Sequence, residues 1–552
     1  MLQSTPKSVQ APVNVVGSST FGRYSKISAE KTYNMFISDG WLVNFPGYRK
    51  VLSIVPAGEG RGIFKSVRGG FMIVVINSIV YRVSSNLLYT PIGNLATYQG
   101  EVFIDENLNS QICIVDGINA YIYNYSLAPN LTVQTLDASL IPNYVTYHNT
   151  FFLFGNANTT GNGAKWFVYQ FATNTTISLV TNGTLSLQTK PDFALAVVRI
   201  PSQGNNVLVM GSTVCEIHTQ VSGAIPYRRN QTINVDYGVL SVNTIGESDQ
   251  FVVWLASNQN NAPTIMVYSE QGAESISSDG IDYLLGSIQY PSQSTATMFR
   301  QDGHLFYILT FYNPADNLTL AFDFTEKKFY HLSDQYLNYH PARSIVYFNN
   351  NIYFVSLNSS ALYLLSSNFT YINENLPSSN EDPNQYYDMQ RIRICSHIRL
   401  NDAADRFIAN KFAMTIEQGV DPRVSGVSLF NNLDPLITED IFIPPDDNII
   451  TETGQLMVDE DSGISNAGGG SGGTNPNVFI TTPPYQPRVD MSISRDGGIS
   501  WSNTVYRNLN PIGYRQNILQ WNKLGAANDM TFKFRFWGLD RFVVNNGIAE
   551  LY

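Results

Sequence analysis

Residues 344–367 read SIVYFNNNIYFVSLNSSALYLLSS, and this stretch shows how the chain is built. Apolar and aromatic residues stand in short runs, and Asn and Ser separate the runs at places where the chain can turn. Short runs rich in β-branched and aromatic residues, bounded by turn residues, predict antiparallel strands joined by tight loops. The stretch therefore predicts a β-hairpin unit.

Six similar units precede this one and begin near Phe71, Gln111, Thr150, Asn206, Phe251 and His304. Successive units start 40, 39, 56, 45, 53 and 40 residues apart. A four-stranded propeller blade needs about 40–50 residues. One blade cannot bury its apolar faces alone, but six or seven blades around an axis can, and the closed ring protects the edge strands. The spacing predicts an all-β chain with a β-propeller of six or seven blades, and two β-sandwiches are the alternative.

Composition divides the chain into three parts. Residues 1–59 are expected to form an extended strand segment that packs on the C-terminal domain, and residues 60–380 to form the propeller. After the polar stretch INENLPSSNEDPNQYYD, strand-like runs return and predict an antiparallel β-sandwich over residues 381–552. Residues 453–477 are acidic and then Gly/Ser-rich, which predicts a disordered insertion in the sandwich.

Bulk composition excludes several classes of protein. The 552 residues include 33 basic and 44 acidic ones, so the net charge of −11 has the wrong sign for gripping nucleic acid. Cys113, Cys215 and Cys395 are widely spaced, which predicts buried thiols in a protein made in a reducing cytoplasm and disfavours a disulfide framework or a zinc site. Neither a signal peptide nor an apolar run long enough to span a membrane is recognised.

Residues 494–501, SRDGGISW, have the form of an Asp box, a motif that recurs in sialidases and other sugar-cleaving propellers. Ser494 is the first residue of the motif. Asp496 is expected to accept hydrogen bonds from turn amides, and Trp501 is expected to pack under the hairpin. Gly497 and Gly498 are expected to take backbone angles closed to other residues. These tasks are structural, so the motif predicts a hairpin rather than a catalytic site.

The sequence shows no recognisable set of catalytic groups. A glycosidase needs two carboxylates facing a cleft. The acidic pairs Glu439-Asp440 and Asp446-Asp447 and the triplet Asp459-Glu460-Asp461 stand in Pro-rich or low-complexity segments. The six histidines lack metal-binding spacing, and phosphate-binding and nucleophile motifs are missing. We therefore predict a binding or assembly protein with no catalytic, metal-binding or cofactor-binding residues, and not an enzyme.

Three segments resemble one family, the packaged-DNA stabilisation proteins of short-tailed bacteriophages. The first comprises YNMFISDGWLVNFPGYRKV at 33–51 and GRGIFKSVRGGFMIVVINSIVYRV at 60–83, with its F-P-G, R-G and Y-R-V elements in the family's order. The second runs over 205–257 and contains the G-S-x-x-x-E strand. The third, over 494–538, is similar to the hairpin series of phage tail β-domains.

The resemblance implies a tail hub, or nozzle, subunit of the virion. It implies a homohexameric ring below the portal and adaptor that closes the DNA channel, retains packaged DNA and passes it at ejection. Implied partners are the adaptor or portal ring and tail fibre, spike or needle proteins, while DNA passes through the lumen without specific binding. The alternative function is a tail-associated glycan-binding or glycan-cleaving β-propeller.

Overall fold

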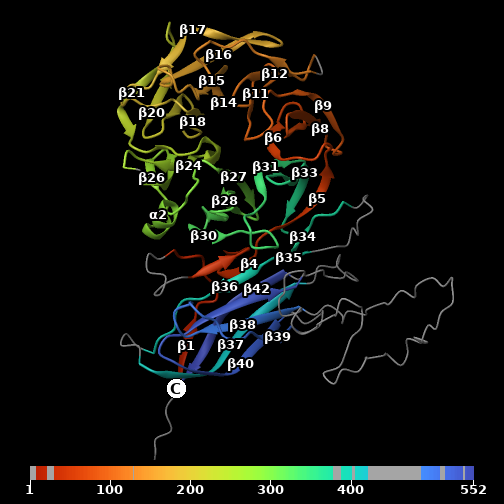
Figure 1. Ribbon diagram of the computed structural model, residues 1–552, viewed down its shortest axis with the longest axis vertical. Coiled ribbons are helices and arrows are strands. Elements are labelled where there is room, and N and C mark those ends of the chain that lie inside the picture. The colour runs from red at the N-terminus through yellow and green to blue at the C-terminus, as the bar shows by residue number, and fades with distance from the viewer. Residues whose placement is uncertain are drawn as a thin grey trace, which may run out of the picture.

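The computed structural model describes residues 8–21, 30–127, 130–260, 262–376, 387–400, 405–419, 487–509, 516–538 and 541–552. Strands make up nearly all regular structure in these residues, and the helices are η1 (Val242–Thr244) and α2 (Asp279–Gly286). Figure 1 shows a ring of sheets joined to a stack of two sheets. The predicted all-β chain, with a propeller and a C-terminal sandwich, is confirmed.

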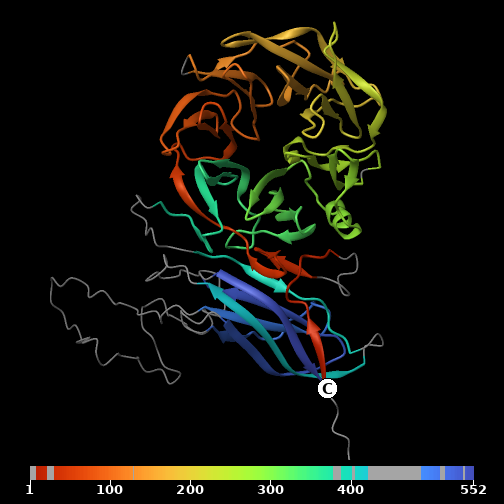
Figure 2. The same ribbon diagram turned by 180° about the vertical axis from the view of Figure 1, so that it is seen from behind.

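Seven sheets of the described residues surround one axis and form the blades of the propeller (Figure 2). Blades 1 and 2 contain β6 (Gly60–Ser66), β7 (Phe71–Ile76), β8 (Ile79–Val83) and β9 (Tyr89–Asn94), then β10 (Phe103–Glu106), β11 (Gln111–Val115), β12 (Ala120–Asn124) and β13 (Thr132–Val133). Blades 3 and 4 contain β14 (Pro142–His148), β15 (Phe151–Asn156), β16 (Lys165–Thr173) and β17 (Thr176–Ser186), then β18 (Ala196–Arg199), β19 (Asn206–Met210), β20 (Cys215–Gln220) and β21 (Tyr227–Val235).

The remaining blades depart from this plain order of four consecutive strands. Blade 5 has a divided first strand, β22 (Gly238–Val239) and β23 (Gly246–Glu247), followed by β24 (Val252–Ser257), β25 (Thr264–Ser269) and β26 (Gly272–Ser275). Blade 6 contains β27 (Ser294–Gln301), β28 (His304–Phe311), β29 (Leu318–Asp323) and β30 (Lys328–His331). Blade 7 contains β31 (Ala342–Phe348), β32 (Asn351–Ser356) and β33 (Ala361–Ser366).

Strand β7 shows why the blades need one another. All six of its residues are buried, because both faces of the blade are covered by neighbours. Met72, Val74 and Ile76 pack with Val355 and Leu362 of blade 7. The alternate residues of β7, Phe71, Ile73 and Val75, pack with Ile112 and Ile114 of blade 2. Successive side chains of a strand point to opposite faces of its sheet. A strand whose side chains are buried on both faces therefore needs another sheet on each side, and a radial arrangement of blades supplies both.

The outer strand of blade 7 comes from the N-terminal segment. Strand β5 (Gly47–Ser53) pairs antiparallel with β33, so residues before blade 1 close the ring. Residues 1–59 are predicted to pack on the C-terminal domain, but β5 pairs with blade 7 of the propeller instead. The reason is that the exposed edge of β33 needs a partner strand, and β5 precedes blade 1 directly.

The C-terminal domain is a sandwich of two sheets that includes strands from the N-terminal segment. One sheet has the order β3 (Met35–Ser38), β4 (Trp41–Asn44), β42 (Arg541–Leu551), β37 (Phe407–Gly419) and β40 (Gln516–Ala527), and β1 (Val9–Val13) also pairs with β42. The facing sheet has the order β2 (Lys31–Tyr33), β36 (Arg391–Ile394), β41 (Thr531–Trp537), β38 (Arg488–Ser494) and β39 (Val505–Asn508). Phe412, Trp521 and Phe534 fill the space between the sheets.

The propeller and the sandwich share a sheet. Strand β2 pairs in parallel with β30 of blade 6 at Tyr33 and His331, and antiparallel with β36 of the sandwich. On the side of blade 7, β34 (Tyr371–Asn373) pairs with β5 and with β35 (Tyr387–Asp388). Backbone hydrogen bonds therefore run from blade 6 into the sandwich without a break. The predicted insertion at 453–477, with its glycine-rich run 468–473, lies outside the described residues.

Candidate functional site

Charged side chains of the inner strands contact one another between blades. Asp105 of β10 accepts a hydrogen bond from the backbone N–H of Tyr147 at 2.6 Å, and its Oδ2 lies 3.3 Å from Nη1 of Arg199 in β18. The Nε of Arg199 also donates to Oε2 of Glu247 in β23 at 2.8 Å. Four blades are joined in this way, because β10, β14, β18 and β23 belong to blades 2, 3, 4 and 5.

The electrostatics of this network are those of a paired, structural cluster. Glu247 raises the pKa of the Arg199 guanidinium, so the cation persists at every relevant pH. Burial raises the pKa of the Asp105 and Glu247 carboxyls, and the nearby Arg199 opposes that shift. The pairing with Arg199 thus offsets part of the cost of burying the two carboxylates, and removal of Arg199 would leave them without that compensation.

A second set of contacts joins blade 6 to the connection between blades 1 and 2. The hydroxyl of Thr295 in β27 donates to Oε2 of Glu101 at 2.9 Å. Burial raises the pKa of Glu101 to about 8, although Arg343 and the Thr295 hydroxyl act in the opposite direction. Arg343 of blade 7 donates to the backbone oxygen of Gly60 at 3.0 Å and lies 3.5 Å from Glu59 of the chain entering blade 1.

These contacts tie parts of the ring that are not adjacent. Glu101 lies in the connection between β9 of blade 1 and β10 of blade 2, and Thr295 lies in β27 of blade 6. Their hydrogen bond therefore links two parts of the ring that are separated by blades 7 and 1.

The sequence analysis did not identify the axial residues. Asp105, Arg199, Thr295 and Arg343 lie in the first strand of a blade, ahead of the hairpins whose longer apolar runs predict the propeller, and Glu101 lies in the connection before β10. The available signal was an isolated charge within an apolar strand, which costs free energy unless it is paired. That signal marks a buried polar residue without identifying its partner.

Ser38, His304 and Asp323 have the hydrogen-bond order of a serine hydrolase triad. The Nε2 of His304 lies 3.1 Å from the Ser38 hydroxyl, and its Nδ1 lies 2.7 Å from Oδ2 of Asp323. The His304 ring packs edge-on against Phe36 and stacks on Phe306. His304 is only 5% exposed, and none of the three residues lines the hollow between blades 1 and 2 or the hollow between blades 3 and 4. The group connects the β3–β4 hairpin of the sandwich to blade 6.

Arg393 anchors the N-terminal segment to the sandwich. The side chain is fully buried and donates to the backbone oxygens of Val15 at 2.9 Å, Ser18 at 2.9 Å and Asn14 at 3.0 Å. It also pairs with Glu30. The planar guanidinium suits this task because it presents several donors in fixed directions.

The Asp-box-like residues form a closed hydrogen-bonded turn between β38 and β39. Asp496 accepts hydrogen bonds from the backbone N–H groups of Ile499 at 3.1 Å and Ser500 at 2.9 Å, and the Ser494 hydroxyl donates to it at 2.7 Å. The hydrogen bonds from Ser500 lower the pKa of Asp496. Gly497 and Gly498 have φ angles of 75° and 87°, a region that favours glycine.

The surroundings of Trp501 are cationic. The Nζ of Lys533 lies 4.6 Å from the centre of the indole ring, so the ring covers a charged side chain of β41. Trp501 keeps intermediate exposure. A structural role for Ser494, Asp496, Gly497, Gly498 and Trp501 stays our prediction.

Other residues singled out in the sequence are placed as follows. The three cysteines are buried and unpaired. Within the described ranges, no group of three or more His, Cys, Asp or Glu side chains could hold a metal ion. Over the same ranges, no helix is long and apolar enough to cross a membrane. The acidic groups at 439–440, 446–447 and 459–461 lie outside the described residues.

A propeller fused through one sheet to a sandwich defines a two-domain all-β protein. Two family models match the chain: bacteriophage P22 Gp10, beta-propeller, over residues 29–370, and bacteriophage P22 Gp10, beta-sandwich, over residues 470–551. The chain belongs to the bacteriophage P22 Gp10 family, and it is a structural protein of the phage tail. A search of curated proteins finds no match.

Solved structures similar to this chain include other propellers. A streptogramin B lyase shares 11% identity, covers 60% of this chain and 99% of its own, and gives a TM-score of 0.39. A virginiamycin B lyase from Staphylococcus aureus shares 12% identity over 58% of this chain and 98% of its own, with a TM-score of 0.38. The WD40 beta propeller domain of Doa1 shares 11% identity over the same fractions, with a TM-score of 0.37. At these scores the likeness carries no argument about activity.

Proposed function

We propose that the protein is a subunit of the tail hub, or nozzle, which forms a six-fold ring below the portal and adaptor. The ring closes the DNA channel, retains packaged DNA and passes it at ejection. The observation that carries this proposal is the match of both domains, in order, to one family of phage tail proteins.

Two properties of the chain support the position of the DNA path. The bond between Thr295 and Glu101 links blade 6 to the connection between blades 1 and 2 on the inner side of the ring, so we place DNA between copies rather than within one propeller. A chain with a net charge of −11 has few cationic sites that could bind DNA phosphates. DNA can therefore slide through a lumen without being held by phosphate contacts. Retention would then depend on protein contacts that close the lumen.

Exposed aromatic and apolar side chains support assembly. Tyr98, Tyr283, Tyr347 and Tyr506 are each more than half exposed, and tyrosine is enriched among the anchors of protein interfaces. Neighbouring copies in a ring contact one another through two different surfaces, and closure depends on a fixed angle between them. A propeller tied to a sandwich by a shared sheet can hold such an angle.

Electron microscopy and native mass spectrometry of the purified chain test the proposal. We expect rings of six copies, alone or on addition of adaptor protein. Phage particles that lack the protein should package DNA and then lose it to added nuclease. A monomer that stays monomeric with adaptor, or particles that keep their DNA without the protein, would contradict the proposal. New reducing ends on host polysaccharide would instead support the glycan-cleaving alternative.

A further inference from the structure

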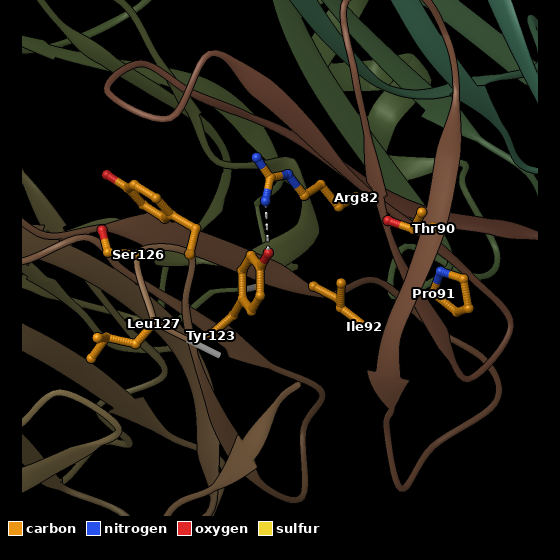
Figure 3. Close-up of a pocket in the computed structure, with 8 residues that line it drawn as sticks. Arg82, Thr90, Pro91, Ile92, Tyr123, Ser126 and Leu127 are labelled. Atoms are coloured by element: carbon orange, nitrogen blue, oxygen red, sulfur yellow. Dashed lines mark hydrogen bonds between the residues drawn. The ribbon is translucent and has the colours of Figure 1, made fainter. Parts of the chain in front are cut away.

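A hollow of about 410 Å³ lies between the outer strands of blades 1 and 2. Arg82, Thr90, Pro91 and Ile92 line it from blade 1, and Tyr123, Tyr125, Ser126 and Leu127 line it from blade 2. Blades radiate from an axis, so their outer strands diverge and leave such grooves at the rim. Figure 3 shows the Arg82 guanidinium directed into this hollow, with Thr90 and Pro91 on one side and Ser126 and Leu127 on the other.

The guanidinium of Arg82 has unused hydrogen-bonding capacity. Its Cζ lies 4.2 Å from the centre of the Phe71 ring, and its Nη1 makes one long contact of 3.4 Å with the Tyr123 hydroxyl. Within the described part of the chain, no carboxylate lies within ion-pair distance of it. An arginine has five N–H donors and favours planar, bidentate acceptors. Most of these donors are thus available to a ligand in the hollow.

A second hollow shows that the cation is specific to the first. It lies between blades 3 and 4, has a volume of about 320 Å³, and is lined by Phe151, Gln170, Val180, Gln220 and other uncharged residues. The divergence of the blades accounts for both hollows. Of these two hollows, the one between blades 1 and 2 combines that shape with a positive charge.

We propose that the hollow between blades 1 and 2 binds a carboxylate presented by an extended segment of a partner polypeptide. The two carboxylate oxygens match the fork of Arg82, and the Ser126 and Thr90 hydroxyls can donate to the same group. Ile92, Pro91 and Leu127 provide an apolar wall for the neighbouring side chain of the segment. This site adds a docking function for acidic peptides that does not depend on ring formation.

A polypeptide carboxylate fits the hollow better than a nucleic acid phosphate. Nucleic acid binding uses several cations along a backbone, whereas this hollow has one cation in a chain of net charge −11. A single acidic side chain between apolar residues satisfies both the charge and the shape.

The test is a ligand-observed NMR titration of the full chain with two acetylated dipeptide amides, Ac-Glu-Leu-NH2 and Ac-Gln-Leu-NH2. We expect the glutamate peptide to bind at least about tenfold more tightly, since a charge-assisted bidentate pair contributes more than a neutral contact. Arg82→Gln should abolish this preference, and Arg82→Lys should keep part of it. Arg228→Gln, which removes the same charge from an exposed site on β21, should leave binding unchanged.

Leu127→Glu tests the site without disturbing the stack on Phe71. Leu127 is 61% exposed at the lip, so the substitution is compatible with folding, and its carboxylate should compete for Arg82 and weaken glutamate-peptide binding. Equal affinity for the two peptides, an unaffected Arg82→Gln variant, or an equal loss in Arg228→Gln would overturn the proposal. Displacement of the glutamate peptide by a short single-stranded oligonucleotide would assign the hollow to nucleic acid instead.

Discussion

The hydroxyl of Thr295 donates a hydrogen bond to Glu101 at a distance of 2.9 Å. The two residues are 194 positions apart: Thr295 lies in blade 6, and Glu101 lies in the connection between blades 1 and 2. A carboxyl in this position stays protonated near neutral pH, because burial raises its pKa from 4.5 to about 8. The centre of the ring is therefore sensitive to pH in a defined direction.

Glu101→Gln should flatten the dependence of stability on pH. In the wild-type chain, the unfolded state releases the Glu101 proton near pH 4.5 and the folded state releases it near pH 8. The free energy of unfolding therefore falls as pH rises between these values. Glutamine can still accept from Thr295, so at pH 8 the variant should be more stable by about 2 kcal/mol, given about 1.4 kcal/mol per pKa unit and partial relaxation. Urea unfolding at pH 5 and pH 8 measures this, and parallel curves for the two proteins would contradict it.

Ser38 should act as a structural contact and not as a nucleophile. We expect a fluorophosphonate probe to leave Ser38 unlabelled in the full chain, because the His304 ring that would activate it is buried among Phe36 and Phe306. Ser38→Ala should cost about 1 kcal/mol, the usual effect of one hydrogen bond. His304→Ala should cost about 3 kcal/mol, because it leaves the buried Asp323 carboxylate without its partner. Chemical denaturation gives these values, and labelling of Ser38 followed by mass spectrometry would contradict the structural role.

Arg393→Lys should loosen the N-terminal segment. Lysine keeps the charge but cannot reach the backbone oxygens of Asn14, Val15 and Ser18 together, so we expect a loss of about 2–4 kcal/mol. Amide hydrogen exchange should rise in β1, while β7 of blade 1 should keep its protection. An exchange pattern identical to wild type would show that the segment is held by strand pairing alone.

Asp496→Ala should open the turn between β38 and β39. The backbone N–H groups of Ile499 and Ser500 lose their acceptor, and their exchange should increase by about tenfold as the turn opens locally. The substitution should leave the mass of any assembled ring unchanged. If Asp496→Ala altered turnover on a polysaccharide, a catalytic role for the motif would replace the structural one.

Local patterns in the sequence account for the blades. The short apolar run of β7 and the Asn, Gly and Asp turns specify hairpins, because these features depend on neighbouring residues, and the spacing of the hairpins specifies a ring. The pairing of β5 with β33 could not be predicted, since it joins strands about 300 residues apart and any exposed edge could have received β5. The partners of Glu101, Arg199 and Arg393 could not be predicted either, because they lie far away in the sequence.

The pairing of β1 with β42 sets the order in which the molecule can be completed. Val9 lies opposite Leu551, so a strand made early by the ribosome must wait for one made more than 500 residues later. Domains otherwise fold as they emerge, and contacts between distant residues form slowly. Half-made chains consequently lack a finished sandwich, and subunits would join a growing tail only after translation has passed the last strand.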